Sequence, residues 1–239
     1  DESPAKKAFV EILKIKYGDI QSLNAAWNTR IKSWNAFARS VDHNASLTTE
    51  RLADYSALLF ALSNKFFEVT STELGKIMPN HLYVGSRFAE WGMTPEVIRG
   101  AAAHVDVVSY NVYTEGLAAD KWDFLADINM PSLIGEFHFG TLDVGMFHPG
   151  IVTAATQAER ARRYQEYMYS VIDNPYFVGA HWFQYIDSPA AGRVWDGENY
   201  NVGFVSVADI PYGEMIDAAY EVKSKLYERR YGDVSSNSN

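Results

Sequence analysis

One glutamate of the chain interrupts an apolar segment. Glu136 stands at the end of Leu133-Ile134-Gly135-Glu136-Phe137, which has the character of a buried β-strand. A carboxylate buried there is costly unless it has a partner or a chemical task. The task could be nucleophilic attack or proton transfer, whereas the alternative is a structural ion pair with an arginine. Gly135 beside it would allow close approach of another segment.

Polar and aromatic side chains also lie at the C-terminal ends of three other apolar segments. We predict strands over 81–86, 105–113, 132–137 and 177–183, separated by helices over 95–103, 120–128 and 156–172. Further helices are expected over 4–17, 20–27, 48–78 and 212–231, the first opened by Ser3-Pro4 and closed by Gly18. The strand-end residues that we select as candidate substrate-binding groups are Arg87, Asn111, Tyr113, His138, Trp182 and Gln184.

The alternation of strands and helices predicts parallel βα units of an α/β protein. Four strands are half of the eight that a TIM (β/α)8 barrel requires. We therefore expect residues 1–232 to form the C-terminal half of such a barrel, about strands five to eight, with 233–239 as a disordered tail. A doubly wound domain is the competing architecture, but no Gly-rich phosphate loop follows any strand.

The composition of the chain limits the classes of ligand that it can bind. The net charge of -9 disfavours nucleic acid, anionic membranes and strongly acidic polysaccharides, so a neutral substrate fits best. There is no cysteine, no diagnostic metal-ligand spacing and no apolar run long enough to span a membrane. We expect no metal or other cofactor. The aromatic content of 14% suits a sugar-binding cleft, although a large core would also use such residues.

A carboxylate pair is needed if Glu136 attacks an anomeric carbon, because a second carboxyl group, about 5–5.5 Å away, must protonate the leaving oxygen. Glu90 and Glu115 each lie a few residues beyond a strand, and Glu2 precedes a helix, where an acidic residue is common. None is convincing as this acid/base. We expect it upstream of Asp1.

Three segments together resemble strands six, seven and eight of clan A glycoside hydrolases. They are Ser109-Tyr110-Asn111-Val112-Tyr113, Ile134-Gly135-Glu136-Phe137-His138-Phe139-Gly140 and Gly179-Ala180-His181-Trp182-Phe183-Gln184-Tyr185. In that clan the strand-seven glutamate is the nucleophile and a strand-eight tryptophan lines subsite −1. The segments around Glu136 and Gly85-Ser86-Arg87-Phe88-Ala89 look closest to the family 50 β-agarases.

The resemblance implies a retaining β-agarase that hydrolyses the β-1,4-galactosidic bonds of agarose or neoagaro-oligosaccharides. It also implies a secreted or periplasmic enzyme whose signal peptide is not in this chain, and a partner in the N-terminal half of the barrel. The Asn-Glu acid/base motif of the family is absent here. A family 42-type β-galactosidase and a non-catalytic fragment therefore stay open as alternatives.

Overall fold

The computed structural model describes residues 3–40 and 47–232. Glu2 and the tail expected over 233–239 lie outside these residues. The chain divides into two compact units, one made of Asp1–His81 and Thr94–Val105, the other of Leu82–Met93 and Asp106–Asn239. Each unit is described by itself.

The first unit is helical. Its helices are α1 (Pro4–Tyr17), α2 (Ile20–Trp27), α3 (Trp34–Arg39), α4 (Thr49–Ile77) and α5 (Pro95–Ala102). The start and end of α1 follow the predicted signals, since the Ser3 hydroxyl accepts from the amide of Lys6, and Gly18 takes the positive φ of 75° that ends the helix. The prediction did not include α3.

A buried carboxylate organises the core of this unit. Asp54 on α4 accepts hydrogen bonds from Lys16, Tyr17 and the indole of Trp27, at 2.6, 2.6 and 2.7 Å. Burial alone would raise the pKa of Asp54, but these three donors outweigh it and the pKa is lowered. Several aromatic residues of the sequence therefore serve the core and not a ligand site.

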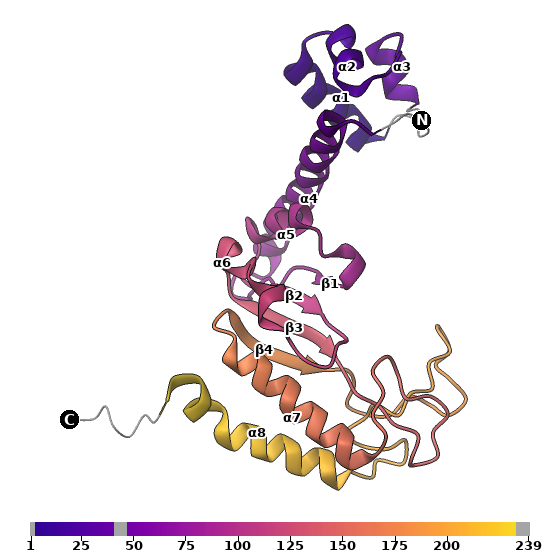
Figure 1. Ribbon diagram of the computed structural model, residues 1–239, viewed down its shortest axis with the longest axis vertical. Coiled ribbons are helices and arrows are strands. Elements are labelled where there is room, and N and C mark those ends of the chain that lie inside the picture. Colours follow the sequence, from indigo (N-terminus) through magenta and orange to yellow (C-terminus); the bar gives the residue numbers. More distant parts are fainter. Residues whose placement is uncertain (1–2, 41–46, 233–239) are drawn as a thin grey trace, which may run out of the picture. The chain divides into compact units, whose positions relative to one another are not determined.

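The second unit contains a four-stranded parallel sheet in the order β1-β2-β3-β4 (Figure 1). This confirms the predicted mixed α/β fold with a parallel sheet. In chain order the elements are β1 (Arg87–Phe88), the 3-10 turn η1 (Glu90–Gly92), β2 (Val108–Asn111), the 3-10 turn η2 (Ala119–Trp122), α6 (Leu125–Ile128), β3 (Ser132–Phe137), α7 (Gln157–Asp173), β4 (Phe177–Trp182) and α8 (Gly213–Tyr231).

The first strand is shorter and later than predicted. The prediction over 81–86 was wrong, because the structure forms strand only at Arg87–Phe88. Gly85 has a left-handed φ of 64°, which breaks the extended conformation just before it. The amide of Tyr83 is instead bonded to the Asp106 side chain, and its carbonyl accepts from the Asp106 amide. Likewise, the helix predicted over 120–128 divides into η2 and α6.

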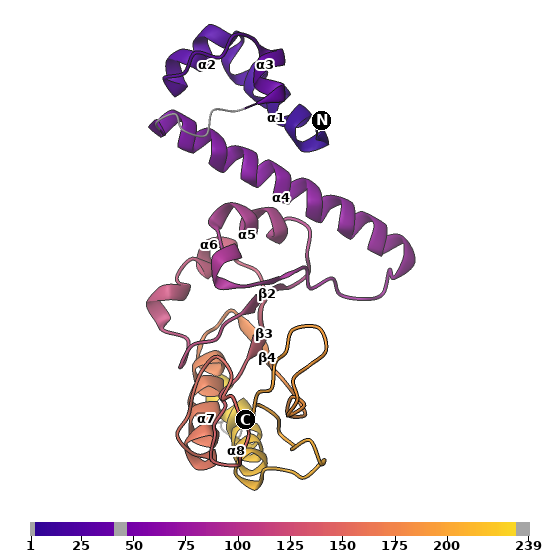
Figure 2. The same cartoon turned by 90° about the vertical axis from the view of Figure 1, so that its right-hand side faces the viewer.

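Helices α7 and α8 lie side by side along β3 and β4 (Figure 1). Phe137 of β3 faces them and stacks on Tyr167 of α7, with ring centroids 4.1 Å apart. Because side chains alternate along a strand, Glu136 points to the opposite face of the sheet. The long connections from β3 to α7 and from β4 to α8 extend beyond the carboxyl ends of these strands (Figure 2). None of the described helices is both long and apolar enough to cross a bilayer.

Candidate active site

Arg87 of β1 and Tyr113, which follows β2, both donate to the carboxylate of Glu136 on β3. The guanidinium of Arg87 lies 2.5 Å from Oε1, and the hydroxyl of Tyr113 donates to Oε2 at 2.6 Å. The Glu136 side chain retains 16% of its exposure. Both oxygens are therefore oriented by charge-assisted bonds while the group stays reachable.

A glycine makes the Arg87 contact possible. Arg87 stands on β1 and must cross β2 to reach β3. A Cβ atom at Gly135 would lie 2.7 Å from Arg87 Cδ and 2.6 Å from Ser109 Oγ. The missing side chain of Gly135 thus leaves the channel through which the aliphatic part of Arg87 runs.

Tyr113, the third member of this trio, is partly buried. Burial, followed by the hydrogen bond and the negative charge of Glu136, raises the pKa of its phenol. The phenol therefore keeps its proton and donates to the carboxylate. Its ring also contacts His138, at 4.7 Å between centroids.

His138 occupies a structural position beneath this trio. Its Nδ1 bonds the carbonyl of Phe183 at 3.1 Å, and its Nε2 accepts from the amide of Ile151 at 2.8 Å. The ring is 1% exposed, and burial lowers its pKa to about 4. Both nitrogens are occupied, so the neutral imidazole joins two loops at the carboxyl end of the sheet. Neither ring nitrogen is thus free for a hydrogen bond to a substrate, and the role of His138 in substrate binding stays a prediction.

The remaining predicted residues lie in different surroundings. Trp182 packs edge-on against Phe137 at 5.1 Å, on the helix side of the sheet, and its indole donates to Val202. Asn111 is the ladder partner of Glu136. The Gln184 amide donates to Ser188 at 3.3 Å in the loop after β4. The structure thus joins Arg87, Tyr113 and Glu136, places Asn111 beside them, and separates Trp182.

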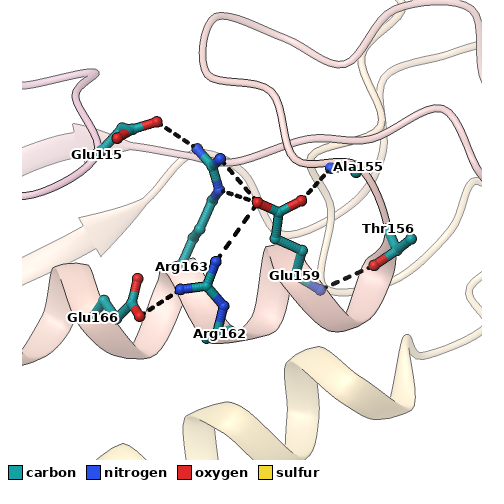
Figure 3. Close-up of polar contacts among 7 residues, drawn as sticks. All are labelled: Glu115, Ala155, Thr156, Glu159, Arg162, Arg163 and Glu166. Atoms are coloured by element: carbon teal, nitrogen blue, oxygen red, sulfur yellow. Dashed lines mark hydrogen bonds and ion pairs between the residues drawn. The ribbon is translucent and has the colours of Figure 1, made fainter.

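The other candidate carboxylates lie in different surroundings. Glu115 bonds Arg163 of α7 at 2.8 Å, within an ion-pair network on that helix (Figure 3). Glu90 lines a cavity of about 460 Å³ with Trp122 and Lys121. In the part of the chain that the structure describes, neither forms a hydrogen bond or ion pair with Glu136, and Glu2 lies outside that part.

Glu198 was not among the candidate carboxylates selected from the sequence. It lies in the connection from β4 to α8 and pairs with Arg193. Burial raises its pKa, and the negative charge of Glu136 contributes in the same direction. This second carboxylate is thus within electrostatic reach of the first. Its only sequence signal was a place in a Gly- and Asp-rich loop after a strand end.

A buried polar network holds these loops. Asp187 accepts from the Asn201 amide at 3.0 Å, the Gly203 backbone at 2.7 Å and the Tyr212 hydroxyl at 2.6 Å. Arg160 of α7 donates to the Gly203 carbonyl, and burial lowers the pKa of Arg160 to about 10. The network ties the β4–α8 connection to α7. Within residues 3–40 and 47–232, no three His, Asp or Glu side chains gather as a metal-ligand set.

A partnered glutamate at the carboxyl end of a parallel β/α sheet, with long loops beside it, is the arrangement of a clan A glycoside hydrolase. Comparisons with known proteins place the chain in a glycoside hydrolase family. Residues 2–133 match the glycoside hydrolase family 42 model, described as Beta-galactosidase, and the chain belongs to that family.

Curated relatives and a solved structure confirm the resemblance to β-agarases. The chain is 54% identical to Beta-agarase B of Vibrio sp. (strain JT0107), over 96% of this chain and 24% of that protein. It is 47% identical to Beta-agarase A of the same strain, over 99% of this chain and 24% of that protein. The structure of an exo-beta-agarase superposes with a TM-score of 0.94 at 54% identity, over 96% of this chain and 31% of that one. The chain thus spans about a quarter of the curated relatives it matches.

Proposed function

We propose that this chain is the nucleophile-bearing part of a retaining β-agarase that hydrolyses β-1,4-galactosidic bonds of agarose or neoagaro-oligosaccharides. The observation that carries the proposal is the Glu136 carboxylate, held by Arg87 and Tyr113 at the carboxyl end of β3. The β-agarase relatives support the substrate class.

In this mechanism a Glu136 oxygen attacks the anomeric carbon while the glycosidic bond breaks. The leaving oxygen takes a proton from a second carboxyl group, which then removes a proton from the water that cleaves the glycosyl ester. The Tyr113 and Arg87 donors keep the attacking oxygen oriented through both steps. Two inversions at the same carbon retain its configuration.

The proton donor is proposed to come from a segment upstream of Asp1. Glu115 pairs with Arg163 and Glu198 with Arg193, so both have other electrostatic tasks. We further propose that residues 1–232 form the C-terminal half of a (β/α)8 barrel and need the N-terminal half as partner. A secreted or periplasmic location is part of the same proposal, because agarose is an extracellular polymer.

A β-galactosidase of the family 42 type is the second candidate, favoured by the family match over residues 2–133. A substrate comparison with the natural full-length protein separates the two. We expect rapid cleavage of agarose and slow cleavage of a simple aryl β-galactoside. The reverse preference would select the β-galactosidase.

The stereochemistry is tested by proton NMR of the first products. Retention predicts that the β-anomer appears first and then mutarotates. An initial α-anomer would mean inversion and would remove Glu136 as nucleophile. Glu136→Gln serves as the control and should be folded but inactive on both substrates.

A further inference from the structure

The six-residue segment Arg193–Glu198, here named the tryptophan loop, lies in the connection from β4 to α8. Its ends are bonded to each other, since the Arg193 amide donates to the Glu198 carbonyl at 2.9 Å and the Gly197 amide to the Arg193 carbonyl at 2.8 Å. Gly197 and the preceding Gly192 have positive φ values of 75° and 87°. The backbone is thus a closed turn that these glycines permit.

Arg193 fixes the loop from inside. Its side chain is 13% exposed and forms ion pairs with Asp196 and Glu198. The guanidinium also lies over the rings of Phe183, at 5.4 Å, and Trp195, at 5.5 Å. Since Phe183 directly follows β4, the loop is attached to the end of that strand.

Trp195 is therefore a large aromatic side chain on a well-anchored loop, yet it is 79% exposed. An exposed tryptophan on a fixed turn loses little conformational freedom when a ligand covers it. The loop is also connected to the trio around Glu136 by contacts. Arg193 lies over the ring of Phe183, the Phe183 carbonyl bonds His138, and the His138 ring contacts Tyr113. Aromatic faces suit the apolar C–H face of a neutral sugar ring.

We propose that Trp195 is a specificity-determining residue that stacks on a sugar ring of the substrate chain, at least one ring away from the bond that Glu136 cleaves. The proposal rests on the proposed function, since the sugar chain is the substrate of Glu136. Arg193 is a positioning residue that holds the indole in place. The substrate part recognised is a neutral galactan ring, which agrees with the net charge of -9.

The test is a chain-length series of neoagaro-oligosaccharides with the natural full-length protein. In Trp195→Ala we expect kcat/KM for the longest substrates to fall about 10- to 100-fold, as is typical of a tryptophan that a bound partner covers. The shortest cleavable substrate should change less than about threefold. Trp195→Phe should restore most of the loss. Arg193→Ala should show the same length dependence, mainly through KM.

Two exposed residues provide matched controls. Val194 is the exposed neighbour of Trp195 on the loop, and Tyr220 is an exposed aromatic residue on α8. Val194→Ala and Tyr220→Ala should leave the length series unchanged.

A loss in Trp195→Ala that is equal for all lengths, or a lowered melting temperature in place of a kinetic change, would overturn the proposal. The second outcome would assign Trp195 to a protein contact. If Glu136→Gln kept its activity, the proposed function would fail instead, whatever Trp195 does.

Discussion

At the scale of single residues, the site depends on a channel between strands. The stem of Arg87 crosses the place where a side chain at position 135 would stand. We predict that Gly135→Ala lowers kcat about 10- to 100-fold, because small displacements of reacting groups have effects of that size. Kinetic assay of the natural full-length protein, with a melting curve for each variant, checks this.

A double-mutant cycle identifies the cause. In an Arg87→Ala background, which is itself less active, Gly135→Ala should have a smaller further effect, since the Cγ and Cδ atoms of Arg87 are gone and only the Ser109 hydroxyl remains as a close neighbour. Gly179→Ala on β4 is the control, because its Cβ would meet only a flexible Leu133 methyl at 3.2 Å. Strictly additive losses would argue against the channel.

His138 gives a prediction on pH. Its folded pKa of about 4 lies below the ordinary value of 6.5, so the unfolded chain binds the proton more readily. The stability that the neutral ring contributes is complete above pH 6.5 and is lost as the pH falls towards 4, by at most about 3 kcal/mol. Denaturant titrations at several pH values across this range give the free energy of unfolding. Its dependence on pH should be weaker, with a shallower slope, in His138→Asn than in the parent.

His181 supplies the control for that experiment, since it is an exposed histidine on the neighbouring strand β4. His181→Asn should keep the parent slope. Equal slopes in the parent and His138→Asn would contradict the assigned burial.

The residues of the site also show how much of it could be predicted from the sequence. Glu136 stood out because a carboxylate in an apolar strand is costly, and Arg87 and Tyr113 followed from the parallel order of strand ends. The predictions for His138 and Trp182 assumed that strand-end residues face a ligand. Side-chain alternation turns Trp182 towards α7, and loop contacts occupy His138. Neither effect is visible in the residue type.

At the scale of elements, the long loops depend on the buried network around Asp187. We predict that Asp187→Ala lowers the free energy of unfolding by about 3–5 kcal/mol, because the buried charge of Arg160 loses its compensation and three donors lose their acceptor. Chemical denaturation measures this. Asp217→Ala on the exposed side of α8 is the control and should change stability by less than about 0.5 kcal/mol.

Element boundaries were predictable where local chemistry sets them. The capping residues Ser3, Thr48 and Thr156 begin their helices at the expected positions. The strand at Arg87–Phe88 was predicted too early in the chain, because Gly85 adopts a left-handed conformation that the neighbouring residue types do not indicate. The tryptophan loop has no periodic pattern, and its closure depends on contacts made only in the folded chain.

At the scale of the whole molecule, the sequence indicated parallel βα units, and the four-stranded sheet confirms them. The chain spans about a quarter of its curated relatives, and the proposed function takes the proton donor from a segment upstream of Asp1. We predict that residues 1–239 expressed alone do not turn over agarose, since loss of a general acid typically lowers the rate about 10²–10⁴-fold.

The comparison requires two samples, residues 1–239 alone and the natural full-length protein, at equal concentration in a reducing-sugar assay. Activity is expected only in the longer one. Comparable rates would place the acid among residues of this chain, with Glu198, Glu90 and Glu115 as the first to replace.

The proposed mechanism requires a covalent bond between Glu136 and the sugar. It is tested directly with a fluorinated galactosyl fluoride, which glycosylates a nucleophilic carboxylate quickly but hydrolyses slowly. After incubation with the natural full-length protein, digestion and peptide mass spectrometry should find the galactosyl ester on Glu136, and none in Glu136→Gln. A label on another carboxylate, or an unlabelled enzyme that still hydrolyses agarose, would contradict the assignment.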